Sequence, residues 1–194
     1  MRNKEGIIPH SVLEGFDNLR SRDVLTSVIS GGNLPFIHQY LHPFWERIIS
    51  ANAPLAIENG GRIVKQDGSN LVYFPLTTSE IQEVLRIASI DTVSFLGYFP
   101  HSPQKNGVVW TPDKKQAAGL QQNFGNNVDV ISTTLQVLEK QAIDDQPAMI
   151  IIRPLSSVDS EKLLKELPAG LNASTSGRLV GVNHQNVNKG TGVV

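Results

Sequence analysis

The sequence contains no cysteine, which excludes disulfide bonds, thiol nucleophiles and cysteine-ligated zinc sites. It also lacks any apolar run long enough to span a bilayer, so no membrane partner is expected. The first residues, Met1 to Gly6, have no apolar core of the kind found in secretory signals. A cytoplasmic location is therefore the expectation.

The chain also has no excess of positive charge. The chain has 17 Lys and Arg residues against 18 Asp and Glu residues, a formal net charge of -1. A nucleic-acid-binding surface needs a basic face, so nucleic-acid partners are not expected. Its 194 residues, of which 40% are hydrophobic, can bury a core and form one domain or two small ones.

A complete metal-binding pattern is absent too. Among the five histidines, His38 and His42 have the i, i+4 spacing that could place two zinc ligands on one helix face. No third ligand follows from the sequence. The neighbouring Leu41 and Phe44 favour packing at the edge of a helix instead. The residues themselves therefore predict no metal ligand in this chain.

The first sixty residues have an α/β pattern. Residues 24–29 form a short, mostly apolar run typical of a strand covered on both faces. Apolar residues at helical spacing follow over residues 36–48, and residues 54–57 form a second short strand. A strand, helix and strand in this order predict a right-handed crossover, and hence two parallel strands.

The rest of the chain reads as α+β. Asp67-Gly68 lies between two β-rich runs, residues 62–65 and 71–74, and predicts a hairpin. Helical and strand patterns then alternate and predict an antiparallel sheet backed by helices. We therefore expect a partial Rossmann-like core of parallel strands and helices, from residues 1–61 and 183–194. An inserted α+β domain would occupy residues 62–182.

The turn after the first predicted strand is the first candidate for function. It reads Ser30, Gly31, Gly32 and Asn33. A hydroxyl at the carboxyl end of a parallel strand lies where open α/β sheets bind ligands. Glycines let backbone N–H groups approach an anion closely at the start of a helix. The alternative is a turn in which serine and glycine serve conformation alone.

Two further turns add candidates. Glu58 and Asn59 end the neighbouring strand and would open onto the same crevice, where they could position a polar substrate. Alternatively, Asn59 and Gly60 supply the positive φ angles of a tight turn. Lys189, followed by glycine at an expected helix start, could bring an ammonium group to a bound phosphate. An exposed lysine near the end of the chain is the other reading.

In order and spacing, these turns resemble motifs of the haloacid dehalogenase (HAD) superfamily of phosphatases. The subgroup is subfamily IIB, with a large α+β cap inserted after the third core strand, as in sucrose-phosphate and mannosyl-3-phosphoglycerate phosphatases. The family's strand ending in Thr/Ser-Gly matches residues 24–31, and its Glu-Asn-Gly-Ala/Gly element matches residues 58–61. Its Lys-Gly-x-Ala element matches residues 188–193. Gly32 departs from the pattern, since many relatives have arginine there.

The resemblance implies a Mg²⁺-dependent phosphatase for a small phosphorylated sugar or related metabolite, acting through an aspartyl-phosphate. It assigns catalytic roles to Ser30 and Lys189. Arg178, at the start of the last cap strand, is a candidate for binding a sugar hydroxyl or a second anionic group, or is an ordinary surface arginine. The implied substrate-binding residues are Gly31, Gly32, Asn33, Glu58, Asn59 and Arg178.

Two family motifs are not matched. The strand ending in Asp-x-Asp would precede Met1, and the metal-binding loop Gly-Asp-x-x-Asn-Asp would follow Val194. The resemblance therefore places the nucleophilic aspartate and the Mg²⁺ ligands outside residues 1–194, and we expect negligible phosphatase activity from these residues alone. Neither Asp17 nor Asp23 is placed to replace the nucleophile.

Several interpretations stay open at this point. The chain could be a fragment, a truncated product or one part of a split enzyme, completed by another chain or by self-association through an exposed sheet edge. It could instead be a catalytically inactive module that binds a phosphosugar or a partner. In a third interpretation, the motif matches are accidental and the chain is an α+β interaction domain.

Overall fold

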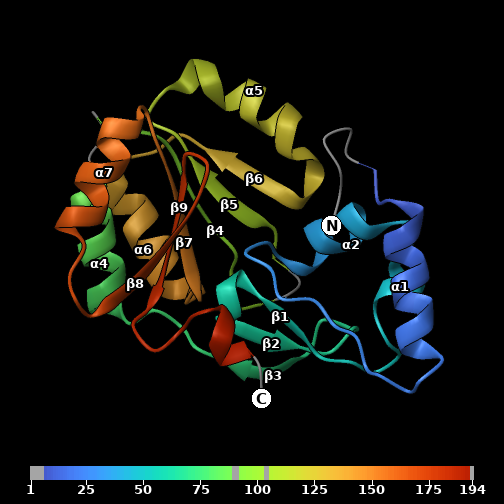
Figure 1. Ribbon diagram of the computed structural model, residues 1–194. Coiled ribbons are helices and arrows are strands. Elements are labelled where there is room, and N and C mark those ends of the chain that lie inside the picture. The colour runs from blue at the N-terminus through green and yellow to red at the C-terminus, as the bar shows by residue number, and fades with distance from the viewer. Residues whose placement is uncertain (1–6, 89–91, 103–104, 193–194) are drawn as a thin grey trace.

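The structure is a computed structural model that describes residues 7–88, 92–102 and 105–192 (Figure 1). The described residues form a three-stranded sheet with the order β1-β2-β3 and a six-stranded sheet with the order β6-β5-β4-β7-β9-β8. Helices pack around both sheets. The α/β core and the additional α+β part predicted from the sequence are confirmed.

The N-terminal part contains the strand, helix and strand crossover predicted from the sequence. Its elements are α1 (His10–Arg20), α2 (Leu34–Leu41), α3 (Trp45–Ile48) and β1 (Leu55–Ile57). Residues 24–29 are extended and make a parallel bridge between Ile29 and Ala56. The N–H of Ala56 donates to the carbonyl of Val28 at 3.0 Å, and the N–H of Ser30 donates to the carbonyl of Ala56 at 2.9 Å. The predicted parallel pairing is therefore present, although the first strand is reduced to one bridge.

The prediction that residues 24–29 are covered on both faces is wrong. Val24, Leu25 and Ile29 keep 43%, 77% and 41% of their surface exposed. The segment bridges to β1 along one edge, and within the described part of the chain no strand pairs with its other edge. These residues therefore form an apolar edge of the sheet.

The single helix predicted over residues 36–48 is divided into α2 and α3. The break falls at His42, whose φ of -59° and ψ of 137° are not helical. His42 precedes Pro43, and the proline ring disfavours the α conformation of the residue before it. The chain therefore turns here before α3 begins.

The predicted hairpin is present as β2 (Arg62–Val64) and β3 (Asn70–Tyr73). We expected it to begin the inserted domain, but β2 pairs antiparallel with β1, with Leu55 opposite Val64. The short 3₁₀ turn η1 (Glu58–Gly60) reverses the chain through positive φ angles at all three of its residues. The hairpin consequently extends the core sheet, and the second part of the molecule begins after β3.

The second part is the six-stranded sheet with its helices. All its neighbouring strands are antiparallel except β5 and β6. This agrees with the antiparallel sheet predicted for this region. The 3₁₀ turn η3 (Lys189–Gly192) follows β9 and contacts η1 and β1. The remaining elements are α4 (Thr78–Ile87), β4 (Val93–Tyr98), β5 (Gly107–Trp110), α5 (Lys114–Phe124), η2 (Gly125–Asn127), β6 (Val128–Ile131), α6 (Leu135–Asp145), β7 (Met149–Pro154), α7 (Ser157–Glu166), β8 (Leu171–Ser176) and β9 (Leu179–His184).

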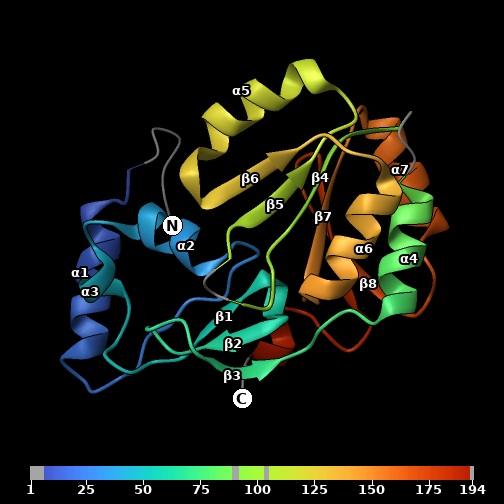
Figure 2. The ribbon, with the colours of Figure 1, turned by 180° about the vertical axis from the view of Figure 1, so that it is seen from behind.

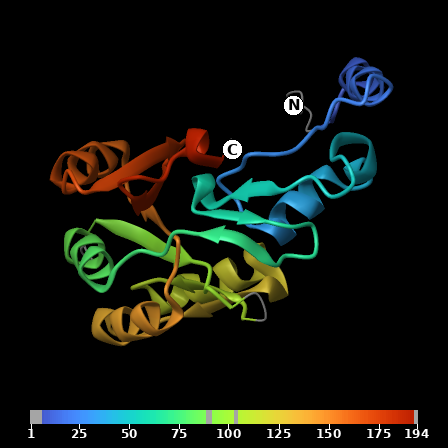
Figure 3. The same cartoon turned by 90° about the horizontal axis from the view of Figure 1, so that it is seen from below.

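The two faces of the six-stranded sheet have different neighbours. One face packs against α4, α6 and α7 in the largest core, to which Ile150 and Ile152 of β7 belong (Figure 2). Since side chains alternate along a strand, Met149 and Ile151 project from the opposite face. That face is turned toward the N-terminal part, and α4, α6 and α7 lie on the side away from it (Figure 3).

Candidate functional site

A cavity of about 460 Å³ lies between the N-terminal part and the six-stranded sheet. The structure brings residues of all three predicted turns into its lining. From the candidates named above, the lining residues are Ser30, Gly31, Gly32, Asn33, Asn59 and Lys189. The Ser30 and Asn59 turns come together because residues 24–30 run parallel to β1, and the turns after two parallel strands open at the same edge of the sheet.

The Ser30 turn is fixed by hydrogen bonds to β1 and to η1. The N–H of Asn59 donates to the carbonyl of Ser30 at 2.9 Å, and the N–H of Glu58 donates to the carbonyl of Gly32 at 3.2 Å. The Oγ of Ser30 accepts from the N–H of Gly32 at 3.0 Å. A hydroxyl that accepts one hydrogen bond still has its proton to donate. Ser30 can therefore hold its own turn and offer a donor to an anion.

The two glycines lie close to neighbouring side chains. Neither has a positive φ among the glycines recorded with one, so left-handed backbone is not the reason. A Cβ on Gly31 would lie 2.9 Å from the Oδ1 of Asn59, and a Cβ on Gly32 would lie 2.7 Å from the ring of Phe36. No other residue fits without displacing these neighbours.

Asn33 has a structural task at the start of α2. Its backbone is extended, and its Oδ1 accepts from the N–H of Phe36 at 3.0 Å. This is the usual geometry of a helix N-cap, which satisfies one of the free N–H groups of the first turn. Asn33 lines the cavity, but its side-chain oxygen already accepts a hydrogen bond from the first turn of the helix.

Asn59 links the two parts of the molecule across the cavity. Its φ of 58° is left-handed, a conformation that asparagine adopts more readily than most residues. Its Nδ2 donates to the Oγ of Ser174 on β8 at 2.7 Å and lies 3.2 Å from the Sδ of Met149 on β7. The side chain thus ties the turn after β1 to the six-stranded sheet.

Glu58 is not among the residues that line the cavity, although the sequence analysis placed it with the substrate. It is only 1% exposed and forms an ion pair with Arg62, with 3.2 Å between Oε1 and Nε. Burial raises the pKa of Glu58 to about 7, while the positive charge of Arg62 acts to lower it. Among the described residues, neither carboxylate oxygen has a hydrogen-bond partner, because Arg62 lies close without being aligned.

Arg62 connects this buried ion pair to the second part of the molecule. Its Nη2 donates to the carbonyls of Phe99, at 3.1 Å, and of Pro100, and its guanidinium lies 5.0 Å from the ring centre of Tyr73. The pair therefore joins the hairpin to the loop after β4. The sequence placed Glu58 at the right turn, but the direction of its side chain depends on Arg62 and this loop.

The two basic candidates have different positions. Lys189 is exposed, lies on η3 and lines the cavity beside the Ser30 turn. Arg178 is exposed in the turn between β8 and β9 and is outside the lining. Ser176 and Leu179, on either side of that turn, do line the cavity. Arg178 therefore lies in a turn whose two flanking residues line the cavity.

The six-stranded sheet, α5 and the loop after β4 supply a wall that the sequence did not indicate. It consists of apolar side chains and a row of hydroxyls: Phe99, Phe124, Val128, Met149, Ile151, Ser174, Thr175, Ser176 and Leu179. One weak signal was available in β8, where Leu171 and Ala173 pack toward the core and alternate with polar residues. It identifies an exposed strand face, but not what that face covers.

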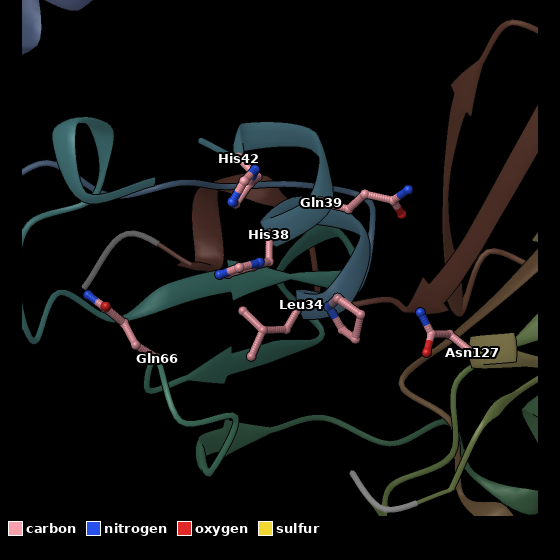
Figure 4. A pocket seen from close by; sticks show the side chains of 7 residues that line it. Leu34, His38, Gln39, His42, Gln66 and Asn127 are labelled. Atoms are coloured by element: carbon pink, nitrogen blue, oxygen red, sulfur yellow. The ribbon is translucent and has the colours of Figure 1, made fainter. Parts of the chain in front are cut away.

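A second hollow, of about 670 Å³, lies beside α2 and shares Pro35, Gln39 and Asn127 with the cavity. Figure 4 shows Gln66 and Asn127 on opposite sides of the helix. His38 packs against Trp45 with 4.8 Å between ring centres, while its centre lies 6.3 Å from that of His42. The packing role predicted for this pair agrees with the contact to Trp45.

The described residues do not form a Mg²⁺ site. Within residues 7–88, 92–102 and 105–192, no three His, Asp or Glu side chains come together in a group that could hold a metal ion. The lining of the cavity, as far as the structure describes it, includes no carboxylate. None of the helices in the described part of the chain is long and apolar enough to cross a membrane.

Comparisons with known proteins connect this architecture to solved structures. No protein-family model and no curated protein matches the sequence. The fold is similar to that of a haloalkanoate (HAD) superfamily phosphatase from Bacteroides thetaiotaomicron, with a TM-score of 0.70 and 15% identity over 99% of this chain and 66% of that one.

Two further structures give the same result. A HAD subclass IIB sugar phosphatase has a TM-score of 0.70 and 12% identity, over 96% of this chain and 66% of that one. A haloacid dehalogenase-like hydrolase from B. subtilis has a TM-score of 0.65 and 16% identity, over 93% of this chain and 68% of that one. The chain thus spans about two thirds of the length of the structures it matches. It has the fold of the HAD superfamily phosphatases, including those of subclass IIB, as the sequence resemblance implied.

Proposed function

We propose that this chain provides the phosphate-binding and substrate-selecting parts of a HAD phosphatase that acts on a small phosphorylated sugar or related metabolite. One observation carries the proposal: Ser30, Gly31 and Lys189 line a single cavity at the end of two parallel strands. A hydroxyl, a close-packed glycine turn and an ammonium group are the groups that bind phosphoryl oxygens.

Each residue has a role that follows from its chemistry. The hydroxyl of Ser30 donates to a phosphoryl oxygen, and the ammonium group of Lys189 offsets the charge that develops on the phosphoryl group during transfer. The leaving group then extends toward the wall formed by the six-stranded sheet. Asn59 holds the two sides together through its hydrogen bond to Ser174.

Hydrolysis through an aspartyl-phosphate also needs a carboxylate nucleophile and a metal ion to neutralise the phosphoryl oxygens. The described residues do not fit that metal site, so no step is assigned to them beyond binding and orientation. We propose that the carboxylates come from polypeptide other than the described residues. The exposed apolar edge at residues 24–29 supports this, because an added parallel strand would cover it.

The first test measures binding of inorganic phosphate and glucose 6-phosphate by isothermal titration calorimetry. We expect Ser30→Ala and Lys189→Ala each to weaken binding about ten-fold, the loss of one charge-assisted contact. Lys140→Ala is the matched control, since Lys140 is exposed on α6, on the far side of the sheet. Unchanged affinity in both test variants would contradict the proposal.

A second candidate function is a binding module without catalytic activity. It is favoured by the lack of a carboxylate among the described lining residues. A polypeptide extended at both ends to the length of the related structures separates the two functions. Mg²⁺-dependent phosphate release by the extended form supports the phosphatase, whereas ligand binding without release supports the module.

A further inference from the structure

Glu58 and Arg62 form a buried ion pair whose two members are unequally bonded. Their side chains are 1% and 7% exposed. The Nη2 of Arg62 donates to the carbonyls of Phe99, at 3.1 Å, and of Pro100. Among the described residues, neither carboxyl oxygen of Glu58 has a hydrogen-bond partner. A buried carboxylate without hydrogen bonds is costly, so this arrangement suits the protonated, uncharged form of Glu58 better than the carboxylate.

The backbones on both sides of the pair are fixed by other contacts. The carbonyl of Glu58 accepts from the Nδ2 of Asn183 at 3.0 Å, which ties it to the six-stranded sheet. Arg62 lies opposite Ile57 of β1 and opposite Tyr73 of β3. A change in the charge of Glu58 is therefore taken up by the side chain of Arg62 and by the groups that this side chain holds.

The loop after β4 is held at two places. Phe99, which lines the cavity, accepts from the Nη2 of Arg62 through its carbonyl. Farther along the loop, the N–H of His101 donates to the carbonyl of Asp145 at 2.8 Å, at the end of α6. The ring of Phe99 lies so close to Gly107 that a Cβ there would be 2.6 Å from it. The bonds from Arg62 thus help to place this ring in the cavity wall.

Charged and titratable side chains around Glu58 come from β2, β3, η3 and the loop after β4. Arg62 forms the ion pair, with 3.2 Å between Nε and Oε1, and its guanidinium lies 5.0 Å from the ring centre of Tyr73. His101 packs against Tyr73 with 4.3 Å between ring centres. Lys189 lies on η3, which contacts η1, but its side chain is exposed. Burial raises the pKa of Glu58 to about 7 against the charge of Arg62, so Glu58 loses its proton near neutral pH.

We infer that the Glu58–Arg62 pair is a proton-sensitive link that sets the position of the Phe99 ring in the cavity wall. When Glu58 is protonated, Arg62 bonds the carbonyls of Phe99 and Pro100, as in the structure. When Glu58 loses its proton to solvent, the carboxylate attracts the guanidinium and draws its N–H groups away from these carbonyls. The loop after β4 then loosens, and the wall that a ligand meets changes with it. This inference does not depend on phosphate binding.

Hydrogen exchange, followed residue by residue with NMR, tests the link at a pH of about 6 and of about 8, on either side of the Glu58 transition. We expect the protection of the His101 amide, relative to its intrinsic rate, to fall about ten-fold, and nuclear Overhauser contacts between the Phe99 ring and Gly107 to weaken. The amide of Leu155 donates to the carbonyl of Thr92 at 2.9 Å, at the other end of β4, and should keep its protection. Unchanged protection at His101, or an equal loss at Leu155, overturns the inference.

Three variants identify the titrating group. Glu58→Gln keeps the shape but cannot ionise, so protection of the His101 amide should vary less than about two-fold over the same range. His101→Gln is the matched control: a histidine also titrates near neutral pH, but this variant keeps the backbone N–H and should retain the full change at position 101.

Arg62→Lys keeps the charge and loses the planar fork of donors, so it should lower protection about ten-fold at both pH values. A pH response that persists in Glu58→Gln or vanishes in His101→Gln overturns the inference, as does unchanged protection in Arg62→Lys. If Glu58→Gln does not fold, the wild type and His101→Gln still decide.

Discussion

At the scale of single residues, buried amides and one buried ion pair connect the two parts of the molecule. The Nδ2 of Asn183, on β9, donates to the carbonyl of Glu58 at 3.0 Å and to the carbonyl of Ala148 at 2.8 Å. Asn183 is buried, so neither carbonyl has water as a ready substitute. The turn after β1 is therefore positioned by a side chain that is distant in sequence.

This contact gives a prediction about stability. Asn183→Ala removes this donor from both carbonyls, although that of Glu58 still accepts from the N–H of Gly61, and should lower the free energy of unfolding by about 1–3 kcal/mol. Asn186→Ala is the matched control, because Asn186 is exposed and its recorded bond uses its backbone N–H; we expect a change within about 0.5 kcal/mol. Urea denaturation measures both variants. Equal effects of the two substitutions would show that the buried bonds contribute little.

Glu58 gives a prediction about pH. Burial raises its pKa from the ordinary 4.5 to about 7, so the folded state binds more protons than the unfolded state between these values. The free energy of unfolding should therefore fall as pH rises through this window. Glu58→Gln removes the titrating group, and its stability should decline less with pH. The lowered pKa values of Asp17 and Asp67 act at more acidic pH and leave this window clear.

Urea denaturation of the wild type and of Glu58→Gln at several pH values between 4.5 and 7.5 measures the two slopes. Because Arg62 keeps its bonds to the carbonyls of Phe99 and Pro100, the variant retains much of the local structure. Identical slopes for the two proteins would mean that Glu58 does not titrate in this range.

At the scale of elements, the start of α4 shows how neighbouring side chains begin a helix. The side chain of Thr77 accepts from the N–H of Glu80 at 3.3 Å, and the Oε2 of Glu80 accepts from the N–H of Thr77 at 2.7 Å. This capping box begins α4. Its two halves satisfy donors that the first helical turn leaves free.

The capping box is testable by a single substitution. Thr77→Ala should lower the free energy of unfolding by about 1 kcal/mol, since the N–H of Glu80 loses its acceptor. Thr78→Ala, one position later and exposed, should change it by less than about 0.5 kcal/mol. Thermal unfolding measures both variants. A loss of stability in Thr77→Ala alone indicates a capping effect, whereas equal losses in both variants indicate a general preference for threonine.

The edge segment shows where element prediction failed. Residues 24–29 have the composition of a strand buried on both faces, yet Leu25 is 77% exposed. The composition of a segment indicates whether it suits a buried strand. It does not show whether a neighbouring strand is present. We expect Leu25→Thr to reduce light scattering of concentrated protein, because it removes apolar surface at an open edge, with little change in stability. Leu55→Thr, at a fully buried position of β1, should instead destabilise the fold by several kcal/mol, about 2–5.

At the scale of the whole molecule, stability should be uneven. β7 and β9 lie inside the six-stranded sheet, and four of their side chains (Ile150, Ile152, Val180 and Val182) are at most 1% exposed. The 24–29 segment makes one bridge to β1, and its Val24, Leu25 and Ile29 side chains are exposed. Native-state hydrogen exchange should therefore find amides of β7 and β9 protected at least about 100-fold more than those of residues 24–29. Uniform protection across both regions would contradict this expectation.

The sequence by itself determined the features that depend on neighbouring residues. The Asp67-Gly68 hairpin and the order of the polar turns are local, because turn chemistry and side-chain periodicity act over a few positions. They were sufficient to predict the α/β class and to identify the Ser30, Asn59 and Lys189 turns that meet in one cavity.

Tertiary structure decided the features that depend on distant residues. The pairing of β2 with β1, the burial of Glu58 against Arg62 and the wall around Phe99 all arise from packing between segments far apart in the chain. No local spacing encodes these contacts, since the direction of a side chain depends on which surface comes to cover it. For the same reason, the sequence located the turns that we propose to bind phosphate, while the surface proposed to select the leaving group became visible only with the six-stranded sheet opposite them.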